Sequence, residues 1–242
     1  MNPSLVGSEM CIRDRWEHIN DLFWNLQDGE ALWREPDQEQ LRNIRRGCQL
    51  FYGITDVTLS RDQAWLFSRL GRLIERADKT SRILDVKYFL LLPIPSAVGG
   101  VLDELQWIAL LRTAGAYQMY RQSVQQAISP TSVARFLLLD PIFPRSVRFC
   151  LQEINNSLER IQHNPIPGSP DDLECLRGQL LAKWSYVRIQ SLIDHGLHEA
   201  IDQLQTDLNQ LHELIHTSYF RTADHTPQDP STISNDPSCS LS

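Results

Sequence analysis

The sequence has no run of apolar residues that approaches the roughly 20 needed to cross a membrane, and it has no excess of positive charge. Its 23 Lys and Arg residues are outnumbered by 30 Asp and Glu residues, which gives a net charge of −7. Nucleic-acid binding depends on a basic surface that neutralises phosphates. The sequence therefore argues against a membrane protein and against a general nucleic-acid-binding protein.

The signatures of several enzyme classes and of secreted proteins are also missing. The five cysteines are scattered and include no CxxC pair, so we expect free thiols in a reducing cytoplasm and neither a zinc site nor a disulfide framework. No Ser or Cys nucleophile stands in a recognisable elbow, and there is no P-loop or dinucleotide fingerprint. No segment shows the alternation of a strand. We predict a cytoplasmic, all-α protein with no cofactor.

The two ends of the chain differ from the rest. Residues 1–15 lack the apolar core of a signal peptide and the Arg/Ser-rich pattern of a transit peptide. The segment from Glu9 to Arg15 resembles a translated transposase end sequence used in DNA library preparation, so we expect residues 1–15 to be non-native; a disordered natural terminus is the alternative. Residues 222–242 hold three acids, three prolines and no Lys or Arg, which predicts a disordered tail.

Helical periodicity and boundary signals predict an elongated helical bundle over residues 16–221. Ser60, with Gln63 three residues later, predicts a capping box at the start of the longest helix, which prolines end after residue 92. Ser129 followed by Pro130 predicts another helix start. We expect helices over residues 16–33, 38–51, 61–92, 102–123, 130–139, 144–163 and 171–220, the last bent near Gly196.

The predicted helix 61–92 is central to the bundle and carries arginines where a core helix usually has leucines. Trp65, Arg69, Arg72 and Arg76 are spaced four, three and four residues apart, so they share one face. We call these four residues the arginine row. A neighbouring apolar face is formed by Leu66, Leu70, Leu73, Ala77 and Leu84. A further ladder is formed by Glu75, Asp78 and Arg82.

Two interpretations of the arginine row stay open. In the first, its guanidiniums hold an anion such as a carboxylate or phosphate; the candidate anion- or partner-binding residues are Arg69, Arg72, Glu75, Arg76, Asp78, Arg82, Arg112, Arg145 and Arg148. In the second, the row forms interhelical ion pairs with Glu75, Asp78, Asp85, Glu104 and Asp140. Guanidiniums enclosed by packed helices are costly without negative partners, but the sequence does not say whether these come from protein or ligand.

Two groups of histidines have metal-ligand spacing. His212, Glu213 and His216 match HExxH, the helix signature of zinc proteases. A third ligand is lacking, because His225 lies in the predicted tail and no glycine turn precedes it, so we interpret the match as the solvated flank of a terminal helix and predict no metal site. His195 and His198, with Glu199, are interpreted as a helix junction at Gly196.

Four stretches resemble the bacterial alpha-E domain family, in the order that the family has them. They are residues 65–85 (WLFSRLGRLIERADKTSRILD), Trp107 with residues 110–117 (LLRTAGAY), residues 136–149 (FLLLDPIFPRSVRF) and residues 196–199 (GLHE). The resemblance covers residues 16–220 and implies an all-helical protein. Family members usually open with another Gly-Arg-x-x-Glu-Arg-Ala helix, so its absence before Trp65 implies an N-terminally truncated chain.

The resemblance also implies a function. Members are typically encoded beside a circularly permuted ATP-grasp protein and a transglutaminase-like peptidase. We therefore expect an accessory or binding component of an ATP-grasp-linked system that makes, modifies or processes a peptide, with those two proteins as partners. Two alternatives stay open. The first is an enzyme with Glu75 as general base, which a position of Glu75 in a concave site would favour. The second is a structural scaffold, which would be favoured if every arginine were paired within the chain and no pocket existed.

Overall fold

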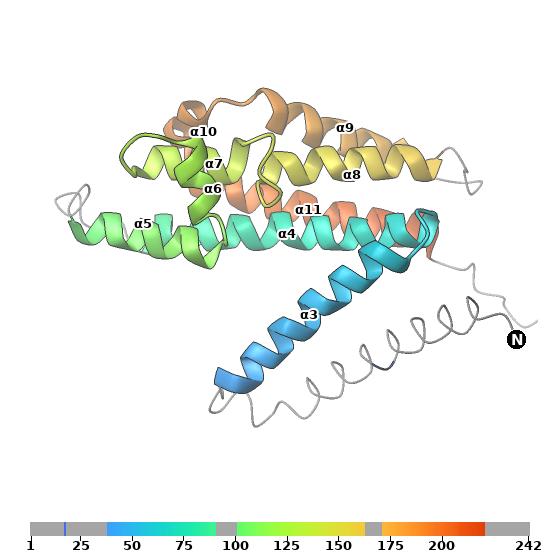
Figure 1. The fold of residues 1–242 in the computed structure, drawn as a ribbon. Helices are drawn as coiled ribbons and strands as arrows, with labels where there is room; N and C mark the ends of the chain where they lie inside the picture. Colours follow the sequence, from blue (N-terminus) through green and yellow to red (C-terminus); the bar gives the residue numbers. More distant parts are fainter. Residues whose placement is uncertain (1–16, 18–37, 91–100, 163–170, 221–242) are drawn as a thin grey trace, which may run out of the picture.

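In the computed structural model, the described residues are Glu17, 38–90, 101–162 and 171–220. This part of the chain is helical and contains no strand, which confirms the predicted all-α fold (Figure 1). The helices are α3 (Gln38–Thr58), α4 (Gln63–Leu90), α5 (Val101–Thr113), α6 (Tyr117–Ser123), α7 (Pro130–Leu139), α8 (Val147–Gln162), α9 (Asp171–Tyr186), α10 (Ile189–His195) and α11 (Leu197–Tyr219). The expectations for residues 1–15, 222–242 and, apart from Glu17, helix 16–33 fall outside the described residues.

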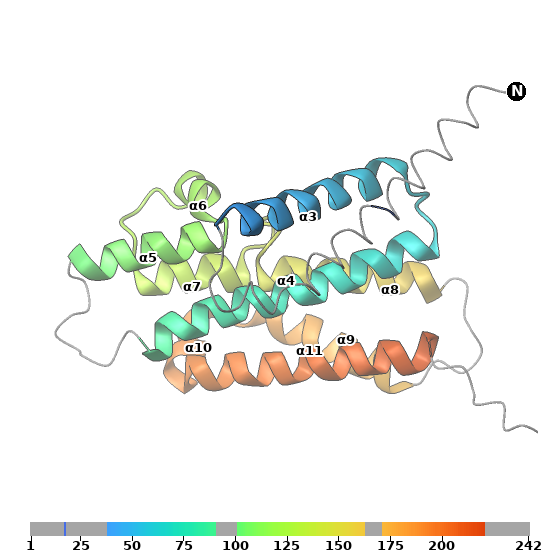
Figure 2. The ribbon, with the colours of Figure 1, turned by 90° about the horizontal axis from the view of Figure 1, so that it is seen from below.

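Helix α4 lies in the middle of the bundle. It packs against α5, α7, α8 and α11, and Figure 2 shows it running between α8 and α11. Its predicted apolar face is buried throughout, in Leu66, Leu70, Leu73, Ala77 and Leu84. Each buried leucine contributes roughly 1.5–3 kcal/mol relative to an exposed one, so this face fixes which side of α4 is left for the arginine row. None of the described helices has the length and apolar character to cross a membrane.

The start of α4 differs from the predicted capping box. The backbone N–H of Trp65 donates to Asp62 Oδ1 at 3.3 Å, and α4 begins at Gln63. Asp62 therefore caps the helix, where Ser60 with Gln63 was predicted to do so. An Asp carboxylate caps orphan N–H groups as well as a Ser hydroxyl does and also meets the positive end of the helix dipole. The prediction placed the right kind of cap two residues too early.

Other boundaries also need correction. The expected helix 102–123 is broken between α5 and α6, because Gly115 adopts φ +64°, a conformation that ends a helix. Helix α3 continues through Gly53 to Thr58, beyond the predicted end at residue 51. Helix α8 begins at Val147, after Ser146 has capped it by accepting from the Phe149 N–H at 3.1 Å. Extended backbone at Arg188 separates α9 from α10. The start of α7 at Ser129 and the bend at Gly196 are confirmed.

Helix α3 diverges from the bundle and meets it near the turn into α4 (Figure 1). One of its side chains nevertheless reaches the arginine row, and another reaches the turn before α4. The guanidinium of Arg72 lies 5.4 Å from the centre of the Tyr52 ring, and Arg61 in the turn binds the Asp56 carboxylate. The last turns of α3 therefore form one wall beside the polar face of α4.

Candidate anion-binding pocket

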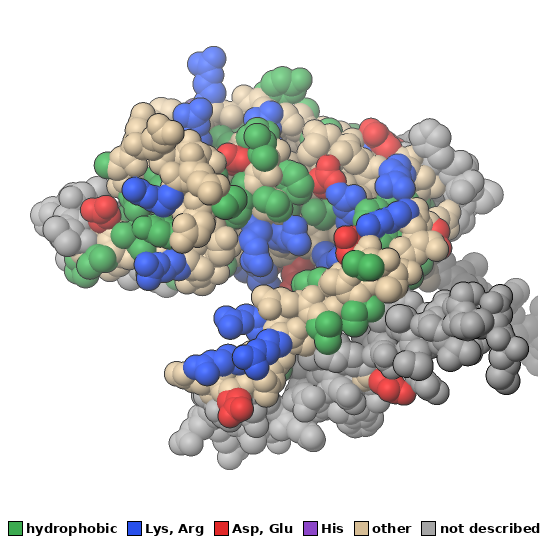
Figure 3. Space-filling model, in the orientation of Figure 1, with side chains coloured by type: hydrophobic (Ala, Val, Ile, Leu, Met, Phe, Trp, Pro, Cys, Tyr) green, Lys and Arg blue, Asp and Glu red, His purple; other side chains and the backbone are tan. Residues whose placement is uncertain are grey.

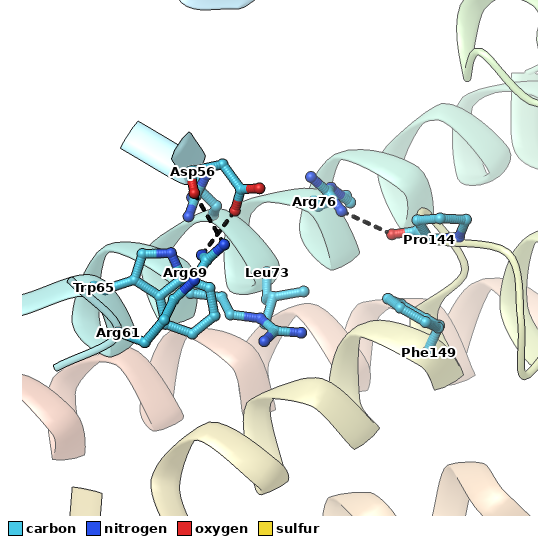
Figure 4. A pocket seen from close by; sticks show the side chains of 9 residues that line it. Asp56, Arg61, Trp65, Arg69, Leu73, Arg76, Pro144 and Phe149 are labelled. Carbon is cyan, nitrogen blue, oxygen red and sulfur yellow. Dashed lines mark hydrogen bonds and ion pairs between the residues drawn. The ribbon is translucent and has the colours of Figure 1, made fainter. Parts of the chain in front are cut away.

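An open pocket of about 430 Å³ lies over the polar face of α4. This volume falls in the range of small-molecule pockets, roughly 300–1,000 Å³. Figure 3 shows Lys and Arg side chains gathered over α4 between α3 and α8. The pocket is lined by Asp56, Arg61, Trp65, Arg69, Arg72, Leu73, Arg76, Pro144 and Phe149 (Figure 4). All four members of the arginine row therefore face one cavity, as their helical spacing predicts.

At one end of the pocket, Asp56 is already engaged by Arg61. The Arg61 guanidinium donates to Asp56 Oδ1 and to the Asp56 carbonyl oxygen, both at 2.9 Å (Figure 4). The hydrogen bond and the charge of Arg61 hold the pKa of Asp56 below its usual value. Asp56 is the one carboxylate among the described lining residues, so the pocket has one internal anion and that anion is paired.

The Trp65 ring is surrounded by cations. The guanidinium carbons of Arg61, Arg69 and Arg160 lie 4.3, 5.0 and 5.8 Å from the ring centre. Such cation–π contacts are each worth roughly 0.5–1 kcal/mol at exposed sites and more when desolvated. The indole is itself buried, at 6% exposure. It therefore acts as a rigid platform that holds several guanidiniums at the wall of the pocket.

Arg69 has a carboxylate partner within the chain. Its guanidinium forms an ion pair with Glu153 of α8, and both side chains are largely covered. Burial lowers the pKa of Arg69, and the nearby charges of Arg160, Arg72 and Arg61 lower it further. The Arg69–Glu153 pair therefore ties α4 to α8 inside a strongly positive neighbourhood.

Arg72 and Arg76 are different, because neither forms an ion pair with a carboxylate in the described part of the chain. Arg72 Nε donates to the carbonyl oxygen of Ser68 at 3.2 Å, and Arg76 Nη1 donates to that of Pro144 at 3.0 Å. Both residues are partly buried. Burial lowers the pKa of Arg72. A guanidinium has five N–H donors, so these two still have donors for an anion in the pocket.

The other six candidate residues lie outside the lining: Glu75, Asp78, Arg82, Arg112, Arg145 and Arg148. Arg82 pairs with Asp78 one turn away on α4, at 2.8 Å. The guanidinium of Arg112 lies 5.3 Å from the centre of the Tyr117 ring. Glu75 is exposed on α4. The structure therefore brings together Arg69, Arg72 and Arg76 and separates them from the second ladder of α4.

Several pocket residues were missed by the sequence reasoning. Arg61 stands four residues before Trp65, so it extends the arginine row by one turn and the same spacing argument would have found it. Asp56 and Glu153 carried no such signal, because α3 and α8 reach α4 only through the tertiary fold. Pro144 and Phe149 lie in the predicted helix 144–163, where only Arg145 and Arg148 were candidate site residues. Spacing finds residues on one helix and is silent about residues that join it from others.

The histidine groups lie away from this pocket. His198 Nδ1 lies 2.7 Å from Asp85 Oδ1, which raises the pKa of His198 and links α11 to α4. His212, Glu213 and His216 are exposed on α11. Over the described ranges, no group of three or more His, Cys, Asp or Glu residues is arranged to hold a metal ion.

One family profile, Alpha-E, matches residues 9–220 and is described as "a predicted alpha-helical domain with a conserved ER motif". No curated protein and no solved structure matches the chain. The sequence contains two Glu-Arg pairs, Glu75-Arg76 on α4 and Glu159-Arg160 on α8. Arg76 lines the pocket, and Arg160 lies over Trp65 and donates to the Arg61 carbonyl at 3.4 Å. Both arginines therefore belong to the pocket or its wall.

Proposed function

The chain belongs to the Alpha-E family, and from this premise we propose that it is the anion-binding component of a cytoplasmic, ATP-grasp-linked system that makes, modifies or processes a peptide. Its partners are a circularly permuted ATP-grasp protein and a transglutaminase-like peptidase. The family resemblance supports these partners. The free thiols of Cys48, Cys150 and Cys175 support a reducing compartment. The pocket over α4 supports the binding of an anion.

The observation that carries anion binding is the charge balance inside the pocket. Four guanidiniums line it, and the one carboxylate among the described lining residues is held by Arg61. Arg72 and Arg76 lie one turn apart without a carboxylate from the described chain. The attraction between two opposite unit charges 4 Å apart is about 4 kcal/mol at an effective dielectric constant of 20. A carboxylate or phosphate held between these two arginines therefore offsets the cost of their burial.

The surrounding residues divide the work of binding. Arg72 and Arg76 donate to the ligand anion, since planar guanidiniums suit the bidentate recognition of carboxylates and phosphates. Arg69 is held in place by its ion pair with Glu153. Trp65 keeps Arg61 and Arg69 in place through its ring. The site is therefore organised before the ligand arrives, which lowers the entropy lost on binding.

A thermal unfolding titration tests anion binding. Inorganic phosphate and acetate are added separately to the full chain at constant ionic strength, with chloride as the reference salt. We expect a saturable rise in Tm that reports about 1.4 kcal/mol of stabilisation at ten times Kd. Arg72→Met should remove the effect. The matched control is Arg82→Met on the same helix, which removes an exposed arginine paired with Asp78 and should keep it.

Two results of this titration would contradict anion binding. One is a Tm that rises equally with chloride, which would show a general salt effect. The other is an unchanged response in Arg72→Met, which would place the bound anion elsewhere on the protein.

The partnership needs its own experiment. Co-expression with the ATP-grasp protein encoded nearby, followed by affinity purification and size-exclusion chromatography, should give a complex that survives both steps. Elution of the two proteins in separate peaks at micromolar concentration would contradict the partnership and leave anion binding to be judged by the titration.

The two alternative functions have less support from the geometry. A general base at Glu75 gains none, because this side chain is exposed and lies outside the pocket lining. A structural scaffold accounts for Arg69 and Arg82, which are paired with Glu153 and Asp78. A purely structural role requires every arginine of the row to have an ion pair within the chain. Arg72 and Arg76 have no ion pair in the described part of the chain.

A further inference from the structure

The two ends of the pocket differ in chemistry. Figure 4 shows Asp56, Arg61, Trp65 and Arg69 gathered at one end, and Arg76 with Pro144 and Phe149 at the other. We call Leu73, Pro144 and Phe149 the apolar end, and the group around Asp56 the polar end. Pro144 is exposed and Phe149 is partly buried, whereas Leu73 is almost fully covered, at 4% exposure. The pocket therefore offers a carbon surface directly beside the unpaired guanidinium of Arg76.

A small anion does not use this surface. Phosphate or acetate on Arg72 and Arg76 would leave most of the 430 Å³ cavity, and the side chains of Pro144 and Phe149, in contact with water. A ligand with an apolar group next to its anion covers the same side chains and gains the free energy of apolar burial. The shape and lining of the pocket therefore favour an amphiphilic anion over a free one.

The polar end adds a second requirement. Arg61 Nη1 binds Asp56 Oδ1, and Asp56 Oδ2 accepts no hydrogen bond from the described residues. A carboxylate oxygen at a pocket wall can accept a backbone N–H from a ligand. A fatty acid has no donor for it, whereas a peptide has one at each residue. Asp56 therefore favours a peptide over a simple hydrocarbon carboxylate.

We propose that the pocket binds the C-terminal carboxylate of a peptide whose last side chain is apolar. The carboxylate lies on Arg72 and Arg76, the last side chain packs against Leu73, Pro144 and Phe149, and a backbone N–H of the peptide donates to Asp56. This proposal rests on the anion-binding function stated above and names its ligand class. It also assigns the choice of last side chain to Phe149, which the sequence reasoning did not single out.

Calorimetric titration of the full chain with four probes tests the proposal. The probes are N-acetyl-Ala-Ala-Phe with a free carboxylate, the same peptide as its C-terminal amide, N-acetyl-Ala-Ala-Gly, and octanoate. We expect the first to bind with the lowest Kd. The glycine peptide should bind about tenfold to a hundredfold more weakly, as expected for the loss of one buried aromatic side chain. The amide should bind too weakly to measure, because the guanidiniums lose their anion.

Variants separate the two ends of the pocket. Phe149→Ala should raise the Kd of the phenylalanine peptide to that of the glycine peptide. It should leave the Kd of the glycine peptide unchanged. Phe149→Leu should keep the preference, because it retains an apolar side chain. Asp56→Asn should raise the ratio of the Kd of each peptide to the Kd of octanoate, because octanoate has no donor for Asp56. Unchanged far-UV circular dichroism shows that each variant is folded, and unchanged phosphate binding shows that the Phe149 variants keep the anion site.

The outcomes distinguish this proposal from the anion-binding function. If phosphate, acetate and all four probes fail to bind, both are wrong. If phosphate binds through Arg72, and N-acetyl-Ala-Ala-Phe and N-acetyl-Ala-Ala-Gly bind with equal Kd, the pocket is an anion site. The proposed preference for an apolar last residue is then wrong. Octanoate binding as tightly as the phenylalanine peptide would overturn the assignment to a peptide.

Discussion

The two halves of α4 use their charged side chains differently. In the second half, Lys87 pairs with Asp103 of α5 and Asp85 pairs with His198 of α11. In the first half, Arg72 and Arg76 are partly buried at a pocket and have no carboxylate partner in the described chain. One helix thus carries charges that pair with neighbouring helices and charges that have no carboxylate partner in the described chain. The comparison separates paired from unpaired charges more sharply than the spacing of the residues does.

Lys87 is the strongest example of a structural charge. It is 2% exposed, and its Nζ lies 2.9 Å from Asp103 Oδ1 and 2.6 Å from Gln106 Oε1. The Trp107 ring lies beneath it, 5.0 Å from Nζ to the ring centre. An ammonium this deeply buried depends on its partner, because water does not reach it. The end of α4 is therefore held to α5 by an ion pair within the chain.

The largest expected effect comes from breaking that pair. Asp103→Leu should lower the free energy of unfolding by about 3–5 kcal/mol, because it leaves the Lys87 ammonium buried without a carboxylate. Urea denaturation measures the change. The double variant Lys87→Met with Asp103→Leu should recover most of the loss. A loss below about 1 kcal/mol for the single variant, which is the range of surface pairs, would show that this end of α4 is not held by charge.

A smaller effect is expected within the first half of α4, at Arg69. Glu153→Gln removes the partner of Arg69 and should lower the free energy of unfolding by about 1 kcal/mol, since both side chains keep some contact with water. The same change should tighten phosphate binding, because Arg69 then becomes a third unpaired guanidinium in the pocket. Urea denaturation and a phosphate titration measure the two effects. Weaker binding would show that Glu153 positions Arg69 for the ligand.

Arg72→Met should change stability less than either substitution above. The guanidinium has no carboxylate to lose, and its stacking on Tyr52 is worth roughly 0.5–1 kcal/mol. The free energy of unfolding in the absence of added anion should therefore shift by less than about 1 kcal/mol. Loss of helicity in this variant would contradict the comparison, since Arg72 would then be a structural charge like Lys87.

The smallest effect is expected at the surface pair between α4 and α11. The hydrogen bond to Asp85 raises the pKa of His198 above the ordinary histidine value of 6.5, so the pair stabilises the fold at pH values below 6.5. This stabilisation should disappear as the pH rises through the raised pKa. Unfolding curves between pH 5 and 9 should show this decline in the native chain and not in His198→Gln. Parallel pH profiles would show that the pair contributes nothing measurable.

Much of α4 and its site could be predicted from the sequence, because both follow from the helical period. The spacing of Trp65, Arg69, Arg72 and Arg76 placed all four at one cavity, and the leucines beside them were correctly expected to be buried. Local chemistry also gave the start of α7 at Ser129. These features depend on residues within a turn or two of one another.

The wrong predictions concern features that depend on tertiary packing or on local backbone conformation. Ser60 and Asp62 are both good caps, and only the path of the turn between α3 and α4 selects Asp62. Gly115 resembles a tolerated helical glycine until its positive φ is known. Glu153 is 84 residues from Arg69, so no spacing rule links them. The sequence therefore could not say which arginines are paired, and that is the property on which the proposed function depends.

The most direct test of the central claim is a titration followed by NMR of the arginine side-chain Nε–Hε signals. The full chain is titrated with N-acetyl-Ala-Ala-Phe, and separately with phosphate, at constant ionic strength. We predict that the signals of Arg72 and Arg76 shift together and saturate with one Kd, while that of Arg82, which is paired with Asp78, stays in place. Equal shifts at Arg82, or unmoved signals at Arg72 and Arg76, would contradict the claim that these two guanidiniums bind an anion from outside the chain.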